Sequence, residues 1–218
     1  MAKLKPAPLT AKTYSRAIQS LCDKDPDLAH ILKVLNPPAF WIRKPGFASL
    51  IRIILEQQVS LASARASFDR LQAAVSPLTP QRFLELDDAG LKSFGFSRQK
   101  SAYGRNLAIA IAEGSLDLKR LEAMDDQKVH AELVKIKGIG PWTASIYLIT
   151  VLRRPDIWPR EDLALAVATW HLKRLKNRPT PQELDNLSTV WKPWRAVAAR
   201  LLWHYYLNYQ GGQPPIRT

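Results

Sequence analysis

Apolar residues along this chain of 218 residues recur mainly three and four positions apart, the spacing of one face of an α-helix. Phe47, Leu50, Ile51, Ile54 and Leu55 form one such stripe. Alternating apolar and polar runs, which are typical of strands, are scarce and short. Breaks between the predicted helices fall near Asn36-Pro37-Pro38, Ser76-Pro77, Gly95, Gly114, Arg154-Pro155 and Arg178-Pro179. The pattern therefore predicts an all-α fold of ordinary helices joined by short turns.

Several helix starts can be recognised from their capping residues. Thr79-Pro80 and Thr180-Pro181 each place a hydroxyl before a proline at the first helical position, and Glu183 completes a capping box with Thr180. Asp125-Asp126 can cap a further helix. The apolar residues of that helix are Val129, Leu133 and Ile136.

The composition indicates a globular protein with a basic surface. Hydrophobic residues make up 46% of the chain, which is enough for a sizeable core. Thirty-two Lys and Arg residues against nineteen Asp and Glu residues give a net charge of +13. This excess favours a polyanionic partner, nucleic acid before an anionic membrane, although a generic basic surface is the alternative.

Other features exclude several classes of protein. The chain has no run of eighteen apolar residues and no apolar region of a secretory signal near Met1, so we expect an intracellular protein without a membrane partner. The single cysteine, Cys22, cannot form an internal disulfide or supply the four thiolates of an iron–sulfur cluster. The four histidines lack the spacing of a zinc or iron site, so no transition metal is assigned.

A glycine-containing turn joins two predicted helices in Leu133-Val134-Lys135-Ile136-Lys137-Gly138-Ile139-Gly140-Pro141-Trp142-Thr143-Ala144. Glycine permits a tight turn and close approach of another backbone. Amides of the turn and of the helix beginning near Pro141 can face a phosphate, which the positive end of the helix also attracts. The motif predicts sequence-independent binding of the DNA backbone through Lys137, Gly138, Ile139 and Gly140.

Three further stretches accompany the turn: Ile54-Leu55-Glu56-Gln57-Gln58-Val59-Ser60, Gly95-Phe96-Ser97-Arg98-Gln99-Lys100 and Trp191-Lys192-Pro193-Trp194-Arg195. Together they resemble the helix-hairpin-helix (HhH-GPD) DNA glycosylase superfamily over roughly residues 40 to 206. Gly-Ile-Gly-Pro-Trp-Thr-Ala is most similar to its alkylated-base branch, the AlkA-type 3-methyladenine DNA glycosylases. The resemblance implies two helical domains that flank a cleft, residues 46–154 ending in the hairpin at about 133–144, and residues 1–45 with 155–218. The β domain that precedes these domains in longer relatives is not expected, because too few residues precede Phe47.

The resemblance also assigns a catalytic carboxylate. Asp162, in Pro159-Arg160-Glu161-Asp162-Leu163, matches the family's catalytic aspartate in spacing and context. Cleavage of an N-glycosidic bond builds positive charge on the sugar, which a fixed carboxylate can stabilise while it orients water. The alternative is that Asp162 only caps the helix that follows, and both roles are compatible. Glu161 is expected to be exposed.

A lyase-type glycosylase needs a lysine nucleophile, which in lyase-active relatives lies two residues after the second glycine of the hairpin. Trp142 occupies that position, so we predict a monofunctional enzyme that leaves an abasic site. By resemblance, Trp142 and Trp203 line the lesion pocket and Trp158 joins them, although a core role is the alternative for each tryptophan. Ile146 stands where some relatives have an aromatic residue.

A base must leave the duplex to be cleaved, and Gln58 matches the position that fills the gap, with a buried amide as the alternative. Gln57 is expected to be structural. Ser97, Arg98 and Lys100 follow the Gly95 turn and can contact phosphate, or form part of a solvated basic face. The resemblance further implies a monovalent cation (sodium or potassium) on the main-chain carbonyls of Val134, Ile136 and Gly138; no cofactor is otherwise required.

The implied function is excision of alkylated bases such as 3-methyladenine and 7-methylguanine from damaged double-stranded DNA, by a monomer, as the first step of base excision repair. Two alternatives stay open. One is a glycosylase for oxidised, deaminated or mismatched bases, and the other is a non-catalytic helix-hairpin-helix module that binds DNA. The preferred base cannot be ranked from the sequence, because pocket shape decides it.

Overall fold

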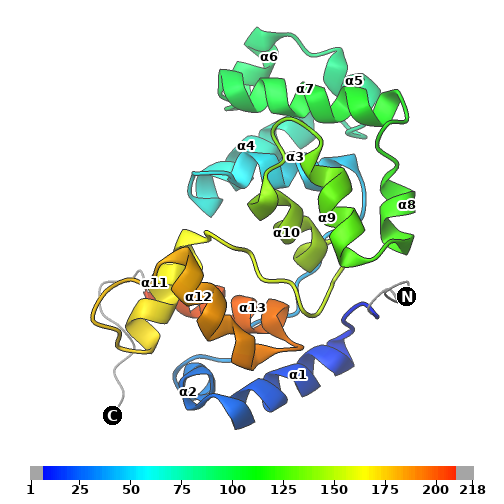
Figure 1. Cartoon of the computed structure of the whole chain (residues 1–218). Helices are drawn as coiled ribbons and strands as arrows, with labels where there is room; N and C mark the ends of the chain where they lie inside the picture. The colour runs from blue at the N-terminus through cyan, green and yellow to red at the C-terminus, as the bar shows by residue number, and fades with distance from the viewer. Residues whose placement is uncertain (1–6, 210–218) are drawn as a thin grey trace. The chain divides into compact units, whose positions relative to one another are not determined.

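The computed structural model describes residues 7–209, which contain helices and no strand (Figure 1). The described chain divides into two compact units, one of Ile42–Leu152 and one that combines Ala7–Trp41 with residues 153–209. The predicted all-α class is confirmed. In the described part of the chain, no helix is both long and apolar enough to span a bilayer.

The first unit is built around one apolar helix, α3 (Phe47–Glu56), whose buried side chains include the whole predicted stripe from Phe47 to Leu55. It packs against three other helices of this unit. The remaining helices of the unit are α4 (Leu61–Ala74), α5 (Pro80–Leu84), α6 (Asp88–Ser93), α7 (Arg98–Ala112), α8 (Leu118–Ala123), α9 (Asp126–Val134) and α10 (Pro141–Thr150). Of these, α4, α7 and α10 contact α3.

The second unit has its own apolar core. Its helices are α1 (Ala11–Lys24), α2 (Pro26–Val34), α11 (Leu163–Leu172), α12 (Pro181–Ser188), the short 3-10 helix η1 (Thr189–Trp191) and α13 (Arg195–Tyr209). Helix α13 is the centre of this unit, because α1, α2, α11 and η1 all contact it. Leu201 and Leu202 on α13 are fully buried among side chains of these neighbours.

The predicted helix starts are confirmed. Thr79 and Thr180 cap α5 and α12 with their hydroxyls, and Thr180 forms the predicted capping box with Glu183. The Asp125 carboxylate accepts from the N–H of Lys128 and caps α9. One detail differs, because α9 ends at Val134 and Ile136 lies in the turn beyond it. The Ile136 N–H bonds back to Leu133 O, which tightens the last turn.

A buried polar cluster ties the second unit together. Asp25 caps α2, and its Oδ2 accepts from Trp191 Nε1 at 2.8 Å and from Lys173 Nζ at 2.9 Å. Burial alone raises the pKa of the Asp25 carboxyl, but these hydrogen bonds and the charge of Lys173 outweigh burial, so that the pKa lies below its usual range. The ionised carboxylate therefore stabilises the fold.

Candidate functional site

The glycine turn joins α9 to α10 in the first unit. Gly138 has φ +107°, a backbone conformation that side chains rarely adopt, and a Cβ there would overlap the Tyr103 side chain. Gly140 caps α10 with an ordinary φ of −85° and no side-chain hydrogen bond. Because Gly140 has no side chain, no capping side chain covers the start of α10, where Pro141 is the first helical residue. This open, positive helix end is suited to a phosphate.

Two amide side chains from other helices hold the turn in place. Gln57 Nε2 donates to Gly138 O and to Thr143 Oγ1, both at 2.9 Å, and thus links the end of α3 to the turn and to α10. Asn106 Nδ2 on α7 donates to Lys137 O at 3.1 Å. The turn therefore has side-chain support from outside the motif. Sequence reasoning gave Gln57 a structural role without finding its partners, and it missed Asn106, because no local pattern links residues so far apart.

Gln58 lies at the surface, directly after the end of α3. It has φ +55°, a left-handed conformation that is uncommon and strained for a residue other than glycine. Its neighbours Val59 and Leu61 are also exposed, at 44% and 52%. The turn thus exposes the Gln58 amide beside two apolar side chains, directly after the residue Gln57 that is anchored to the hairpin. The wedge assignment of Gln58 stays a prediction.

The three residues predicted to contact phosphate at the start of α7 differ in their surroundings. Ser97 caps α7 by accepting from the Lys100 N–H, and Arg98 is exposed at the first helical position. Lys100 instead points inward, because its Nζ donates to Leu55 O at 2.6 Å, at the end of α3. Burial lowers the pKa of its ammonium group. This bond caps α3, which counts against a phosphate contact for Lys100, whereas Arg98 and Lys137 are exposed.

Two of the three carbonyls expected to hold a cation already accept a hydrogen bond. Ile136 O accepts from the Ile139 N–H at 2.9 Å, and Gly138 O accepts from Gln57 Nε2. A carbonyl oxygen has two lone pairs, so a cation would share these atoms with their present donors. Within residues 7–209, no three His, Cys, Asp or Glu side chains gather as metal ligands would.

Asp162 begins α11 in the second unit. Its Oδ1 accepts from the Leu165 N–H at 3.0 Å, and only 6% of the residue is exposed. The preceding Glu161 has φ +63°, and Arg160 pairs with Asp185 on α12 at 2.6 Å. A capping bond, a left-handed residue and an ion pair to α12 therefore fix the loop that presents this carboxylate. The predicted capping role is confirmed, and Glu161 is exposed as expected.

The predicted pocket tryptophans are not equally accessible. Trp203 on α13 and Trp142 on α10 are partly exposed. Trp158 is 8% exposed and packs against Trp191, with ring centroids 5.4 Å apart, in the core of the second unit. Such packing is typical of a core residue and counts against a pocket role for Trp158.

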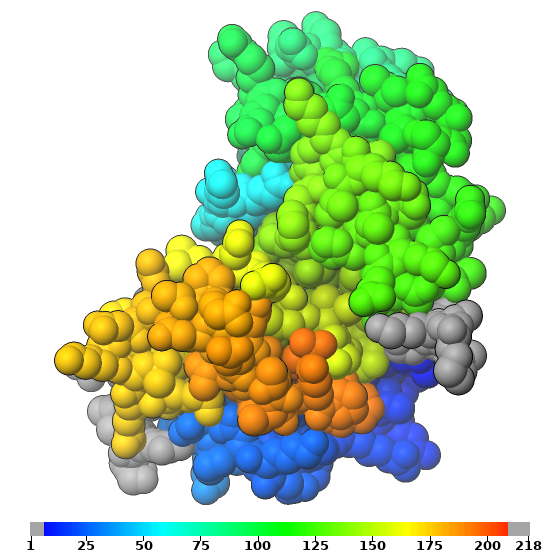
Figure 2. Space-filling model, in the orientation of Figure 1, coloured from blue at the N-terminus to red at the C-terminus, as the bar shows by residue number. Residues whose placement is uncertain are grey.

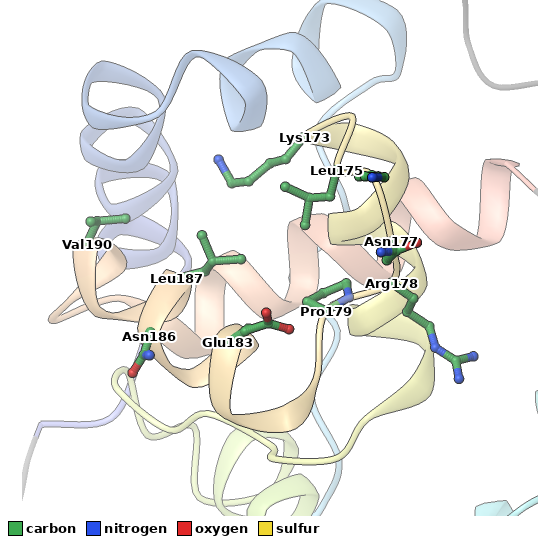
Figure 3. Close-up of a pocket in the computed structure, with 10 residues that line it drawn as sticks. Lys173, Leu175, Asn177, Arg178, Pro179, Glu183, Asn186, Leu187 and Val190 are labelled. Atoms are coloured by element: carbon green, nitrogen blue, oxygen red, sulfur yellow. The ribbon is translucent and has the colours of Figure 1, made fainter.

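A shallow pocket of about 760 Å³ lies elsewhere in the second unit, beside α12 and the loop that follows α11 (Figure 3). Lys173, Leu175, Glu183, Leu187 and Val190 are among its lining residues, and no predicted site residue is. It lies at the opposite end of α11 from Asp162, about 15 Å away along the helix. Figure 2 shows this region, yellow to orange, at the molecular surface.

Comparison with known proteins identifies the superfamily that the residues of the hairpin predicted. Residues 51–194 match the family described as HhH-GPD superfamily base excision DNA repair protein. The chain belongs to this superfamily. The HhH-GPD match spans the glycine turn, the Gln57 anchor and Asp162.

Individual relatives extend the comparison. A putative DNA-3-methyladenine glycosylase of Bacillus subtilis is 31% identical over 162 residues, which are 71% of this chain and 56% of that protein. An alkylbase DNA glycosidase-like protein of Schizosaccharomyces pombe is 28% identical over 207 residues, 92% of this chain and 97% of its own. Among solved structures, the S. pombe 3-methyladenine DNA glycosylase in complex with abasic DNA aligns with a TM-score of 0.82 and 26% identity, and the match covers 93% of this chain and 100% of the other.

Proposed function

We propose that this chain is a monofunctional DNA glycosylase that excises alkylated bases such as 3-methyladenine and 7-methylguanine and so starts base excision repair. The observation that carries the proposal is the fixed, nearly buried carboxylate of Asp162 in a chain that belongs to the HhH-GPD superfamily. Relatives named as 3-methyladenine or alkylbase glycosylases support the substrate class.

The proposed chemistry needs one carboxylate on the protein. As the base leaves, positive charge develops on the deoxyribose, and Asp162 stabilises this charge and orients the attacking water. An alkylated purine is already cationic, so it departs without a strong general acid. The capping bond from the Leu165 N–H restrains the carboxylate, which reduces the reorganisation needed at the moment of reaction.

The DNA backbone is proposed to bind at the hairpin. The turn at Gly138 and Gly140 and the uncapped start of α10 offer main-chain N–H groups, and Lys137 and Arg98 add exposed positive charge. A net charge of +13 supports a salt-dependent affinity for DNA. Gln58 would fill the gap in the duplex, and Trp142 and Trp203 would stack on the extruded base. The domain limits at residues 46–154 and the cleft expected between the domains stay predictions.

Three finer expectations belong to the same proposal. We expect a monomer, an intracellular location and a monovalent cation bound by the carbonyls of Val134, Ile136 and Gly138. The cation can be checked by measuring the melting temperature and DNA affinity in potassium, sodium and a bulky organic cation at equal ionic strength. Equal values in all three salts would count against a bound cation.

The decisive experiment measures base release from alkylated duplex DNA by the wild type and by Asp162→Asn. Asparagine caps helices as well as aspartate does, so the variant should fold and bind DNA normally. We expect wild-type release of methylated purines and a loss of about 100-fold or more in the variant. Strand breaks should need alkali, and borohydride should trap no covalent adduct, because Trp142 replaces the lyase lysine.

Other outcomes favour the alternatives. Release from oxidised, deaminated or mismatched duplexes, but not from alkylated ones, would indicate a different lesion class. The capping bond of Asp162 also suits a non-catalytic DNA-binding module. That module would bind undamaged and abasic-analogue duplexes equally and release no base from any of them. Equal release by the wild type and by Asp162→Asn would reject the catalytic assignment.

A further inference from the structure

The loop of residues 173–178 closes back onto α11 and forms one wall of the shallow pocket beside α12, the α12 pocket (Figure 3). The Leu175 N–H donates to Trp170 O, and the Trp170 indole Nε1 donates to Leu175 O, both at 3.0 Å. Between these residues, Arg174 has a left-handed φ of +53°. Two hydrogen bonds to one residue of α11 therefore fix this wall before a ligand arrives, which lowers the cost of binding.

Two ionisable residues that line the α12 pocket are already engaged by other parts of the second unit. Lys173 Nζ donates to Asp25 Oδ2 at 2.9 Å and to Asp27 Oδ2 at 3.2 Å. The Glu183 carboxylate accepts from the Thr180 N–H at 2.8 Å in the capping box, and this bond lowers the pKa of Glu183. Both side chains thus serve the fold, and recognition of a ligand falls to the other lining residues.

Four of the other lining residues are apolar: Leu175, Pro179, Leu187 and Val190. Leu175 from the loop and Leu187 from α12 lie on facing sides of the pocket, and both are only partly buried (Figure 3). Val190 keeps 60% of its surface exposed, the largest fraction among the large apolar side chains of residues 7–209. Open apolar surface in a concave site favours a ligand that covers it with an apolar group.

Basic side chains border this apolar interior. Arg174, Lys176 and Arg178 are exposed in the loop, and Lys176 and Arg178 also line the pocket. Within residues 7–209, no carboxylate forms an ion pair with any of the three. The lining contains one carboxylate, that of Glu183. The charge around the opening is therefore positive, which makes it complementary to an acidic ligand.

Duplex DNA is also negatively charged, but the α12 pocket suits it poorly. Proteins hold DNA by hydrogen bonds from basic side chains and main-chain N–H groups to its phosphates. The pocket lies at the carboxyl end of α11, where a helix carries partial negative charge. Its aliphatic side chains offer a phosphate no hydrogen bond. An apolar interior with a basic border instead fits an acidic peptide that carries a bulky apolar side chain.

We propose that the α12 pocket is a docking site for an acidic peptide segment of a partner protein. One bulky apolar side chain of the peptide packs between Leu175 and Leu187, and its carboxylates face Lys176 and Arg178. Because the pocket and Asp162 lie at opposite ends of α11, the bound peptide leaves the proposed catalytic carboxylate uncovered. This inference goes beyond the proposed glycosylase function and does not rest on it.

The test selects random peptides, displayed on phage, for binding to the full chain. We expect the enriched sequences to be rich in Asp and Glu around a bulky apolar residue. Fluorescence anisotropy then gives the dissociation constant of an enriched peptide. It should rise about 10-fold when Lys176→Glu and Arg178→Glu are combined, and about 3-fold with Val190→Ser. The affinity for the wild type should also weaken as the salt concentration rises.

Two matched changes in the second unit serve as controls. Lys12→Glu and Arg16→Glu together reverse two exposed charges near the start of α1 and lower the net charge equally. Leu207→Ser alters another exposed apolar side chain, at 52%. Neither control should change the peptide affinity by more than about 2-fold. Melting temperatures close to that of the wild type show that the variants are folded.

Selection without acidic, apolar peptides, or equal losses in the pocket variants and their controls, would overturn the proposal. A loss of affinity for undamaged duplex that is larger with Lys176→Glu and Arg178→Glu than with the α1 control would assign the loop to DNA and also overturn it. Self-association of the wild type that Val190→Ser abolishes would make a second copy of this chain the occupant instead. Base release from alkylated duplex is measured separately, so its absence would contradict the proposed function and leave the peptide result unchanged.

Discussion

Two helix starts, one in each unit, are capped in opposite ways. Helix α10 begins at Gly140, which makes no side-chain hydrogen bond, whereas α11 begins at Asp162, whose carboxylate accepts from the Leu165 N–H. Each helix start has a partial positive charge and N–H groups without helical partners. The first unit leaves these groups for an external anion, and the second supplies an internal one. The same electrostatic feature can thus serve for binding a phosphate or for fixing a carboxylate.

The units also differ in what holds the neighbouring structure. In the first unit, Gln57 and Asn106 donate neutral amide hydrogen bonds to main-chain carbonyls of the turn. In the second, Asp25 and Lys173 form an ion pair that is almost buried. Substitutions should therefore act mainly through backbone geometry in the first unit and through buried charge in the second.

The largest expected effect on stability comes from Gly138→Ala. The new Cβ would overlap Tyr103, and alanine would be strained at φ +107°, so the free energy of unfolding should fall by about 3 kcal/mol. Urea denaturation measures this loss. Gly140→Ala is the control, because a Cβ there meets no atom within 4 Å, and it should cost less than about 1 kcal/mol. Equal losses in the two variants would show that the turn does not require the special backbone at Gly138.

Lys173→Met tests the buried charge of the second unit. Removal of the ammonium leaves the Asp25 carboxylate buried with one donor fewer, which should cost about 2 to 3 kcal/mol at neutral pH. The folded pKa of Asp25 lies below the unfolded one, so its stabilisation is present above about pH 4 and is lost as the pH falls below that value. In thermal melts between pH 2 and 7, the melting temperature of the variant should fall less steeply towards acid pH than that of the wild type. An unchanged pH dependence of the melting temperature would show that other carboxylates cause it.

Gly140→Asp should give α10 an aspartate cap like the one that Asp162 provides for α11. The position has room for a side chain and an ordinary φ, and aspartate would cap α10 as Asp162 caps α11. We expect unchanged or slightly higher stability, but DNA affinity lower by about 10-fold or more, because the carboxylate occupies the amides and repels phosphate. Fluorescence anisotropy with undamaged duplex measures the affinity. Gly140→Asn keeps the cap without the charge and should lose less.

The last comparison concerns two adjacent glutamines, one of which should have almost no effect on stability. Gln57→Ala removes two hydrogen bonds and should lower the free energy of unfolding by about 2 kcal/mol. Gln58→Gly should change the free energy of unfolding by less than about 0.5 kcal/mol. Glycine removes the backbone strain at φ +55° in the folded state, and this gain offsets the greater conformational freedom of glycine in the unfolded chain. Base release should fall mainly in the Gln58 variant, if it is the wedge. Equal release by Gln58→Gly and the wild type would reject that role.

The sequence by itself determined the helical class, the stripe of α3 and the caps of α5, α9 and α12. These features depend on contacts within a few residues, where helical periodicity and capping chemistry act. The hairpin and the membership in the HhH-GPD superfamily could also be predicted from the sequence, because the turn glycines, Pro141 and Asp162 follow one another in the order typical of that superfamily.

Only the tertiary structure decided which polar and aromatic side chains serve which purpose. Lys100 lies in a basic segment, yet it caps α3, and Trp158 is one of several tryptophans, yet it lies in the core. The links from Gln57 to Gly138 and from Arg200 to Trp41 join residues 81 and 159 positions apart. Sequence periodicity describes the face of one helix, whereas such pairs form only when helices pack and bring distant donors to unpaired acceptors.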